Sequence, residues 1–516
     1  MMDRPRILQQ PLFGKSALFR DVELSLENLG VDLRLLGMVA LTLVVSLVGA
    51  VATAYLGLLA IPLAASTILI LFITRQRYRV WWLSLILLLM GYLFLSKGFA
   101  TIGFFPVYVG EAVLAIGILT LVLVPFLGKR VHLRPLLRPE VAVMMLFVVW
   151  QIIQTVPYFR AYQLNTIRDA MLYGYAAFAV LIVLLIPKRD VQGFFDLFGR
   201  LIPLMLIWFP VLFFISRMSL ISVTFPGAPN PILYTKASDM GVHLAGIGAF
   251  MMLELDRRSH PFPRWLRWTN WLLWTANVII LGAMGRAILV TVAASLAIVV
   301  LVQPFRSGWH RPLLLVVIGV CLLVITGLYS TLKIDLGLHR EVSVEQLVEN
   351  VASVFGQGDD SAGGLEGTKQ WRLRWWDAII QYTFHGSYFW MGKGYGVNLA
   401  DSDGFQVQED GSLRSPHNGH LTILARSGVP GLVLWAGFLG LLALRLLRLA
   451  MRRSKSDPWN ARYALWILAY LVAFGIMAGL DVFLEGPMGG IWFWSLIGFV
   501  LVYFTPASDG QVQPQA

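Results

Sequence analysis

The sequence predicts an all-α fold, a polytopic membrane helix bundle of about 12–14 transmembrane helices with one long outer loop that contains short helices. The first reason is composition, because 57% of the 516 residues are hydrophobic and only 14% are charged. A soluble domain carries roughly 45–50% apolar and about 25% charged residues. The second reason is a series of apolar runs long enough to cross about 30 Å of hydrocarbon. The third is the placement of Lys and Arg between these runs, which indicates a fixed orientation.

The chain opens on a polar segment, residues 1–34, in which no short apolar core precedes a small-residue cleavage site. We expect this segment in the cytoplasm, followed by a transmembrane bundle over 35–331. C-terminal transmembrane helices are expected over 417–504, and a polar cytoplasmic tail over 505–516. The individual apolar runs lie at 35–53, 56–73, 80–96, 108–127, 141–157, 169–187, 201–216, 239–254, 269–284, 287–303, 312–331, 417–444, 463–481 and 489–504.

Basic residues orient this bundle, because cytoplasmic loops of membrane proteins carry an excess of Lys and Arg. With the N-terminus in the cytoplasm, roughly 27 of the 41 Lys and Arg residues fall on the inner side and roughly 14 on the outer side. Both termini are therefore expected in the cytoplasm. The net charge of +12 is then mostly a topology signal, and we expect no nucleic acid partner.

The sequence lacks the motifs of several common enzyme classes and metal sites. The chain has one cysteine, Cys321, which excludes an internal disulfide framework and a Cys-based zinc site. It contains no P-loop, no HExxH metalloprotease motif and no dinucleotide fingerprint. Asp401 and Asp403 could hold a divalent metal bridged to a diphosphate. The same stretch also fits a turn, because acids favour turn geometry, and we expect neither a metal nor another cofactor.

The outer loop, residues 332–416, is long enough to be a small extramembrane domain, and loops of this length are usually functional or disordered. From Gly367 to Phe384 large apolar side chains recur every three to four residues, which predicts a helix. This helix could lie in the membrane interface with its tryptophans down. It could equally pack on a core that belongs to the loop.

Arginines on the outer face are the candidate ligand-binding residues, because an Arg beside apolar helices is costly without a partner. Arg286 lies in a tight turn with glycines, where it could snorkel or bind an anion. Arg372 and Arg374 lie among tryptophans, which suits a phosphate ligand or plain contact with lipid headgroups. Arg168 opens an outer helix beside Asp169, so it could bind a ligand or pair with that acid.

His417 follows Ser415 and Pro416 and begins an apolar run. Ser is a good N-cap and Pro a good first helical residue, so we expect a helix to start here. The positive end of the helix dipole disfavours imidazolium, which leaves the ring neutral and able to accept a proton. A general base needs that state, whereas a single His in a sequence is more often structural.

The segment from Ser415 to Gly431 resembles the signature of the O-antigen ligase and O-antigen polymerase family. That signature is a His-Asn pair, nine residues, and then Gly-x-x-Gly. His417 and Asn418 match the pair, and Gly428 and Gly431 match the glycines.

Three further segments are similar to the same family. Residues 392–396 (GKGYG) look like its glycine-rich segment before the His. Arg372 and Trp376 match its loop Arg-x-x-x-Trp, and Arg286 stands where the family has Ser-Arg-Gly. The neighbours of Arg286 depart from that triplet, and Arg374 competes with Arg372 for the loop role.

The resemblance implies a membrane-embedded, metal-independent, inverting glycosyltransferase. Its donor would be a glycan on undecaprenyl diphosphate at the periplasmic face of the bacterial inner membrane, and its acceptor a glycan or lipid. In this interpretation His417 is the general base, and Arg286 and Arg372 bind the diphosphate. The weaker candidates for contact with the diphosphate or glycan are Arg168, Arg374, Asn418 and Trp376.

The sequence is compatible with two kinds of acceptor and with one other class of protein. A ligase would transfer a finished glycan to a lipid or protein, and the His-Asn motif favours it, whereas a polymerase would join lipid-linked repeat units. The rival class is a transporter or lipid flippase. Transporters usually show two matching halves with broken helices and charges near the membrane midplane. The candidate charges here cluster at one face, with Glu111 and Asp481 as the nearest exceptions.

Overall fold

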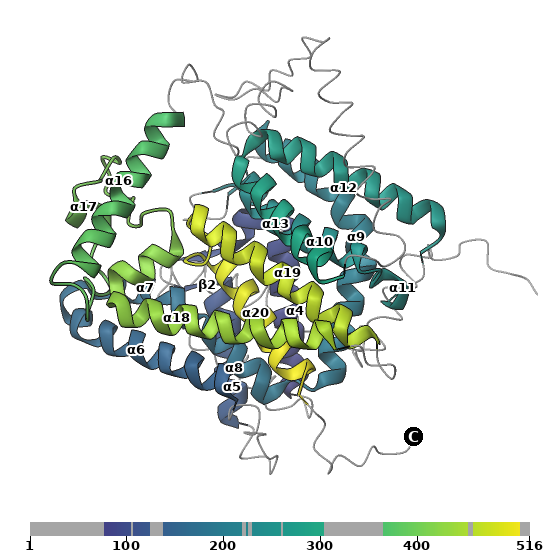
Figure 1. Cartoon of the computed structure of the whole chain (residues 1–516), viewed down its shortest axis with the longest axis horizontal. Coiled ribbons are helices and arrows are strands. Elements are labelled where there is room, and N and C mark those ends of the chain that lie inside the picture. Colours follow the sequence, from purple (N-terminus) through teal and green to yellow (C-terminus); the bar gives the residue numbers. More distant parts are fainter. Residues whose placement is uncertain are drawn as a thin grey trace, which may run out of the picture.

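The structure is a computed structural model that describes residues 77–104, 107–123, 138–218, 223–224, 230–259, 262–303, 365–452 and 458–505. Within these ranges it contains fifteen helices and one two-stranded hairpin, so the prediction of an all-α fold is confirmed (Figure 1). Five of these helices are long and apolar enough to cross a membrane, or six if a bent pair counts as one span. The chain is therefore a polytopic membrane protein.

Most of the predicted apolar runs coincide with these elements, and the bent pair α7 and α8 takes the place of a single run. The runs 35–53, 56–73 and 312–331 lie outside the described residues, as do the segment 1–34 and nearly all of the tail. In chain order the elements are α4 (Arg77–Ala100), β1 (Gly103–Phe104), β2 (Val107–Tyr108), α5 (Val109–Leu123), α6 (Pro139–Tyr162), α7 (Leu164–Gly174), α8 (Ala176–Leu185), α9 (Lys188–Arg217), α10 (Ala237–Met252), α11 (Asp256–Ser259), α12 (Arg264–Met284), α13 (Arg286–Val302), α16 (Leu365–Phe384), α17 (Leu399–Asp403), α18 (Gly419–Met451), α19 (Pro458–Leu480) and α20 (Pro487–Tyr503).

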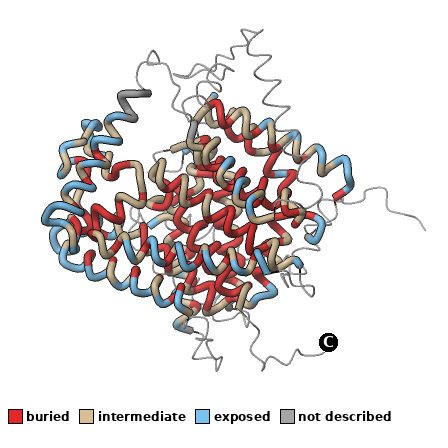
Figure 2. The backbone as a smooth tube through the Cα atoms, viewed as in Figure 1, coloured by how far each residue is buried: buried red, intermediate tan, exposed pale blue. Residues whose placement is uncertain are grey.

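Helix α20 lies in the middle of the bundle. Every residue from Met488 to Tyr503 is buried, and a helix that is apolar on all sides has to be enclosed by others. It packs against α4, α8, α9 and α19, and buried residues fill the centre of the molecule around it (Figure 2). The C-terminal helices therefore share one core with the helices that precede the long loop.

Helices α6 and α18 lie side by side along one edge of the bundle (Figure 1). Large apolar side chains point outward from both of them. Ile153 and Val156 of α6 are 49% and 66% exposed, and Val433 of α18 is 61% exposed. An exposed apolar surface of this kind is rare on a soluble monomer, and it suits contact with lipid.

The described part of the long loop packs in a small core that it shares with α18 at one end of the bundle. Trp375 and Ile379 of α16 are fully buried, and they cluster with Leu399 of α17 and Leu424 of α18. The Trp375 ring stacks on Phe405 at 5.5 Å between centroids. The predicted loop helix is thus confirmed as α16. Of its two predicted placements, the structure shows the one in which it packs on a core, so Trp375 does not face the membrane interface.

One predicted helix start is wrong. Arg168 and Asp169 do not open a helix, because α7 begins at Leu164 and both residues lie within it. The chain then bends by 51° between α7 and α8. Helix α7 is amphipathic, with polar residues in its first turns, so an apolar run alone did not mark its beginning.

Helix α4 is kinked at Ser96, where φ is 56° and ψ is −137°. A residue with a Cβ pays a steric cost for positive φ. Two contacts hold it there: the Ser96 and Thr235 hydroxyls lie 2.8 Å apart, and Ser96 forms a β-bridge with Tyr234. The kink therefore brings the end of α4 against the segment that leads into α10.

Glycines of the His-Asn motif and of the glycine-rich segment 392–396 have a packing role. Gly428 interrupts α18 with a φ of 70°, and a Cβ there would collide with the carbonyl of Phe389. The N–H of Val429 donates to that carbonyl at 2.8 Å. Gly392, also at positive φ, would collide with the backbone of Arg426 if it carried a Cβ. Both glycines let the glycine-rich loop lie directly on α18.

Candidate functional site

The polar turn before α18 carries the candidate base. The helix predicted to begin at Ser415 and Pro416 instead begins at Gly419, with Asn418 as its N-cap. The Asn418 side-chain oxygen accepts two backbone N–H groups of the first helical turn, both at 3.1 Å. Ser415 hydrogen-bonds to Glu485 instead. The predicted start was wrong because Asn also caps well, and its oxygen is used for that purpose.

His417 lies just before this cap in a left-handed conformation, with a φ of 54°. Such a conformation costs a residue with a Cβ on the order of 1–3 kcal/mol and persists only where its neighbours impose it. One neighbour is Trp376, whose indole Nε1 donates to the carbonyl oxygen of Pro416 at 2.8 Å. Trp376 therefore fixes the backbone that presents the imidazole, which is 26% exposed.

Asp481, just after α19, faces His417. Nδ1 of His417 lies 3.5 Å from Asp481 Oδ1, at the outer limit of a hydrogen bond, and has no nearer partner among the described residues. The Val482 N–H and the Ser238 hydroxyl also donate to this carboxylate, at 2.8 and 3.2 Å. Burial raises the pKa of Asp481, but the contacts with His417, Lys236 and the Val482 amide outweigh it and hold the pKa well below its usual range. The carboxylate thus stays ionised and faces Nδ1 of the ring.

A cavity of about 890 Å³ opens beside His417. Its volume is typical of a pocket for a small-molecule ligand. Charged groups of both signs line it, which suits a polar and charged ligand. They are Lys97, Arg168, Lys236, Arg414 and Arg426 on the positive side, and Glu111, Asp169, Asp239 and Glu485 on the negative side.

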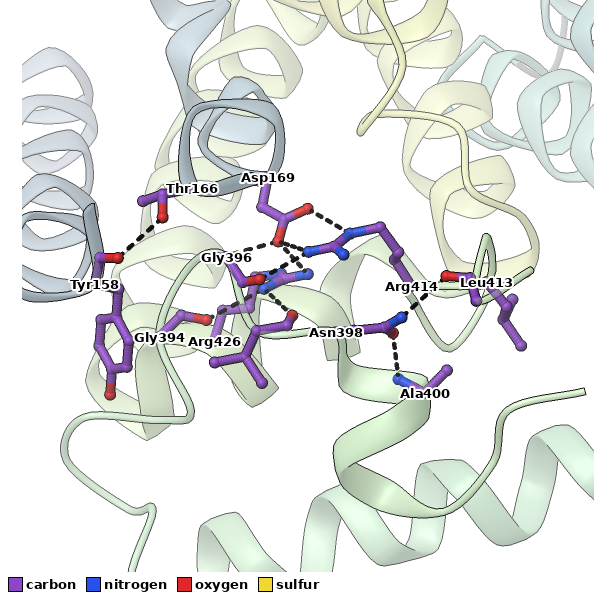
Figure 3. Close-up of polar contacts among 12 residues, drawn as sticks. Tyr158, Thr166, Asp169, Gly394, Gly396, Asn398, Ala400, Leu413, Arg414 and Arg426 are labelled. Atoms are coloured by element: carbon purple, nitrogen blue, oxygen red, sulfur yellow. Dashed lines mark hydrogen bonds and ion pairs between the residues drawn. The ribbon is translucent and has the colours of Figure 1, made fainter. Parts of the chain in front are cut away.

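Asp169 of α7 joins two arginines in one wall of this cavity (Figure 3). Its Oδ2 lies 2.9 Å from Arg414 Nη2 and 3.0 Å from Arg426 Nη2, and it accepts the Gly396 N–H at 3.1 Å. Arg426 is 2% exposed, and its Nη1 donates to two further loop carbonyls at 3.2 and 3.1 Å. The cluster binds α7, the glycine-rich loop and α18 to one another. Buried charges of this kind are tolerated because the Asp169 carboxylate and the two guanidinium groups form hydrogen bonds with one another and with the backbone.

Arg372 of α16 approaches the same carboxylate as His417. Its Nη1 donates to the carbonyl oxygen of Leu480 at 3.2 Å. Burial lowers the pKa of Arg372, and the nearby charge of Asp481 raises it in part. Nε of Arg372 is buried and has no hydrogen-bond partner in the described part of the chain. The guanidinium therefore keeps an unused donor, although Arg372 is not among the described residues that line the cavity.

The other predicted arginines are placed differently. Arg168 is exposed and lines the cavity. The alternative predicted for it was a pair with Asp169, and in the described part of the chain that carboxylate pairs with Arg414 and Arg426. Arg374 is exposed on α16 and is not among the described residues that line the cavity. Arg286 is the first residue of α13, and its side chain lies outside the described part.

Asp403 ties its own loop together. It accepts hydrogen bonds from Trp375 Nε1 at 2.6 Å, Lys393 Nζ at 2.5 Å and the Tyr382 hydroxyl at 3.3 Å. Asp401 is exposed. The stretch that was expected to form a turn is the short helix α17, and Asp403 holds that helix to α16.

The sequence did not predict several of the charged side chains around His417 and the cavity, among them Asp169, Asp481, Arg414, Arg426, Lys97 and Lys236. Two of them carried a signal. Arg426 interrupts the apolar run of α18, and Asp481 ends that of α19, and a charge in an apolar segment is costly and often functional. Asp169 and Arg414 carried none, since they are 245 residues apart in the chain.

The comparison with protein families agrees with the motifs. Residues 271–436 match the family described as O-Antigen ligase. This stretch contains His417, Arg372 and Arg426, whereas Asp169 and Asp481 lie outside it. A search of curated proteins finds no match. The resemblance is thus confirmed over residues 271–436, which match the O-antigen ligase family model.

Proposed function

We propose that this protein is an inverting, metal-independent glycosyltransferase that moves a glycan from undecaprenyl diphosphate to an acceptor hydroxyl during assembly of a cell-surface polysaccharide. The family match supports an activity of the ligase or polymerase type. The observation that carries the reaction type is His417, which lines a charged cavity and has the Asp481 carboxylate behind its Nδ1. This is the arrangement of a general base with an orienting acid.

In the proposed reaction, Nε2 of His417 takes the proton of the acceptor hydroxyl as its oxygen attacks the anomeric carbon. The attack comes from the face opposite the diphosphate, so the anomeric configuration inverts. The bond from that carbon to the phosphate oxygen breaks, and its electron pair leaves with undecaprenyl diphosphate. Arg372 and Arg286 stabilise the charge that grows there, and Asp481 stabilises the imidazolium. Arg168 is assigned to binding of the donor at the cavity.

We place the protein in the bacterial inner membrane with both termini in the cytoplasm and the site at the periplasmic face. The excess of Lys and Arg on the loops assigned to the cytoplasm supports this orientation. The site then meets both membrane-bound substrates on one side, which supplies much of the proximity that the reaction needs.

The test is transfer by the purified full chain. Undecaprenyl diphosphate carrying an oligosaccharide is supplied with candidate acceptors in detergent, and product linkage is read by NMR. We expect the glycan to leave the lipid with inverted configuration, in the presence of a chelator. A single shift of the acceptor means a ligase, the type we favour, and a ladder of repeats means a polymerase. Glycan that stays on its lipid but crosses the bilayer of a vesicle would mean a flippase and overturn the proposal.

Trp376→Phe tests the backbone contact that positions His417. The change keeps an aromatic ring, although a smaller one than the indole, and removes the N–H that binds the Pro416 carbonyl. We expect the free energy of unfolding to fall by about 1 kcal/mol. We also expect kcat to fall roughly tenfold to a hundredfold, because small misplacements of a catalytic group are costly. Trp390→Phe is the control, since Trp390 is 67% exposed. Equal kcat values in the two variants would contradict the positioning role.

Asp481→Asn tests the carboxylate through pH. Because the folded pKa of Asp481 lies below the usual Asp value, ionised Asp481 stabilises the fold above about pH 4. That contribution is lost as the pH falls below about 4 toward the lower folded pKa. We expect the thermal midpoint of the wild type to fall more steeply with acid than that of Asp481→Asn. The exposed Asp377→Asn should follow the wild type, and an equally steep fall in Asp481→Asn would refute the assignment.

A further inference from the structure

Two lysines lie side by side at the cavity that His417 lines. Lys97 is in the last turn of α4, and Lys236 is the N-cap residue of α10. Both are partly buried and both line the cavity. Neither ammonium group forms a hydrogen bond or an ion pair with another residue that the structure describes. The nearest aromatic contact of Lys97 is the Tyr234 ring, 5.9 Å from Nζ.

The strained backbone at Ser96 is what brings the two lysines together. The left-handed Ser96 precedes Lys97, and its hydroxyl partner Thr235 precedes Lys236. On the other side of Lys97, the Gly98 N–H donates to the Tyr234 carbonyl at 3.0 Å. Strain of this kind clusters at functional sites, where the surrounding structure enforces it. The kink therefore fixes a pair of cations rather than a single side chain.

The two ammonium groups repel each other, because both carry positive charge. The carboxylates that face them are Asp239 and Asp481. Asp481 is already held by His417 and two other donors, and within the described residues neither acid forms an ion pair with Lys97 or Lys236. The ammonium protons are therefore available to a ligand with negative charge. A diphosphate has enough oxygens to accept from both lysines at once.

We propose that Lys97 and Lys236 form a binding site for the phosphate oxygens of a diphosphate headgroup. Arg372 reaches the neighbouring backbone, since it donates to the carbonyl of Leu480, the residue before Asp481. The identity of the ligand rests on the proposed function, whereas the placement of the cations does not. A diphosphate bound here shares one cavity with the candidate base.

Binding by the full-length protein in detergent tests the proposal, with geranylgeranyl diphosphate and inorganic pyrophosphate as probes in isothermal titration. We expect Lys97→Met and Lys236→Met each to weaken binding roughly tenfold or more, because each removes a charge-assisted hydrogen bond. Lys97→Arg keeps the charge and should keep most of the affinity. The control is Lys188→Met, at an exposed lysine over the Tyr503 ring.

Each outcome decides the question. Weaker binding of both probes in the Met variants assigns the site to the headgroup alone, and weaker binding of the lipid probe only assigns it to a lipid-linked diphosphate. Met variants that bind as the wild type does would overturn the site, as would a wild type that binds neither probe. Glycan transfer is measured on the same samples. A wild type that binds but transfers nothing overturns the proposed function and leaves the site standing, whereas transfer with unchanged binding in the variants overturns the site alone.

Discussion

His417→Ala is expected to lower kcat for glycan transfer by roughly 10²–10⁴-fold and to leave the KM of the donor nearly unchanged. The variant removes the group that takes the acceptor proton, and the arginines proposed to bind the diphosphate remain in place. The free energy of unfolding should change little, because the imidazole is 26% exposed and its one polar contact, with Asp481, is 3.5 Å long. Initial rates with a lipid-linked oligosaccharide, together with thermal unfolding of the same samples, measure both quantities.

Two other histidines separate this role from a structural one. His385 is exposed at the end of α16, and His385→Ala should have wild-type rates. His420 is three residues from His417, but both of its ring nitrogens are used: Nε2 contacts the Gly475 carbonyl at 2.9 Å and Nδ1 accepts from Trp435 at 3.0 Å. We therefore expect His420→Ala to lower the free energy of unfolding, because it removes both contacts. Wild-type kcat in His417→Ala would end the general-base assignment.

Arg426→Met is expected to give the largest loss of stability, about 3 kcal/mol or more in the free energy of unfolding. Removal of one partner from a buried ion pair usually costs this much. Arg426 is 2% exposed, and its loss leaves the buried Gly394 carbonyl, the partly buried Val397 carbonyl and part of the Asp169 carboxylate without a donor. Chemical or thermal unfolding in detergent measures the loss. Arg374→Met, at an exposed position, should change stability by at most about 0.5 kcal/mol.

A double-mutant cycle shows whether the loss comes from this cluster. Asp169→Asn and Arg426→Met remove the two sides of one ion pair, at 3.0 Å. Their effects should therefore combine to less than the sum of the single variants, since the second change removes a contact already lost. Additive effects would show that Arg426 stabilises the protein through its loop carbonyls alone.

The helices could be predicted from sequence because a membrane span has to be apolar along its whole length, and this pattern is local. Predictions failed where a helix is not a uniform apolar run. Leu164 begins α7 in a polar stretch, and Asn418 caps α18 three residues after the expected Ser415. The surroundings of α16 were left open, because spacing shows that a helix has an apolar face and not what covers it.

The candidate site was predicted only in part, because only some of its residues lie in a local sequence pattern. His417 and Arg372 lie in segments whose residue order is itself a pattern. The partners of His417 are far away in the chain: Asp481 is the residue that follows α19, and no spacing rule connects them. Lys97 and Lys236 come together through a kink at Ser96 that has no signal in the sequence. Side chains that meet through tertiary structure are invisible to any argument from local pattern.

The Asp169 cluster has a consequence for how this family region can be moved between proteins. The family match covers residues 271–436. Two arginines within this segment, Arg414 and Arg426, form ion pairs with Asp169 of α7, which lies before it in the chain. The acid behind His417 comes from after it. In a chimera that carries only residues 271–436 of this chain, the host protein would have to supply acids equivalent to Asp169 and Asp481. The matched segment thus lacks the acids that neutralise its own buried arginines and face its histidine.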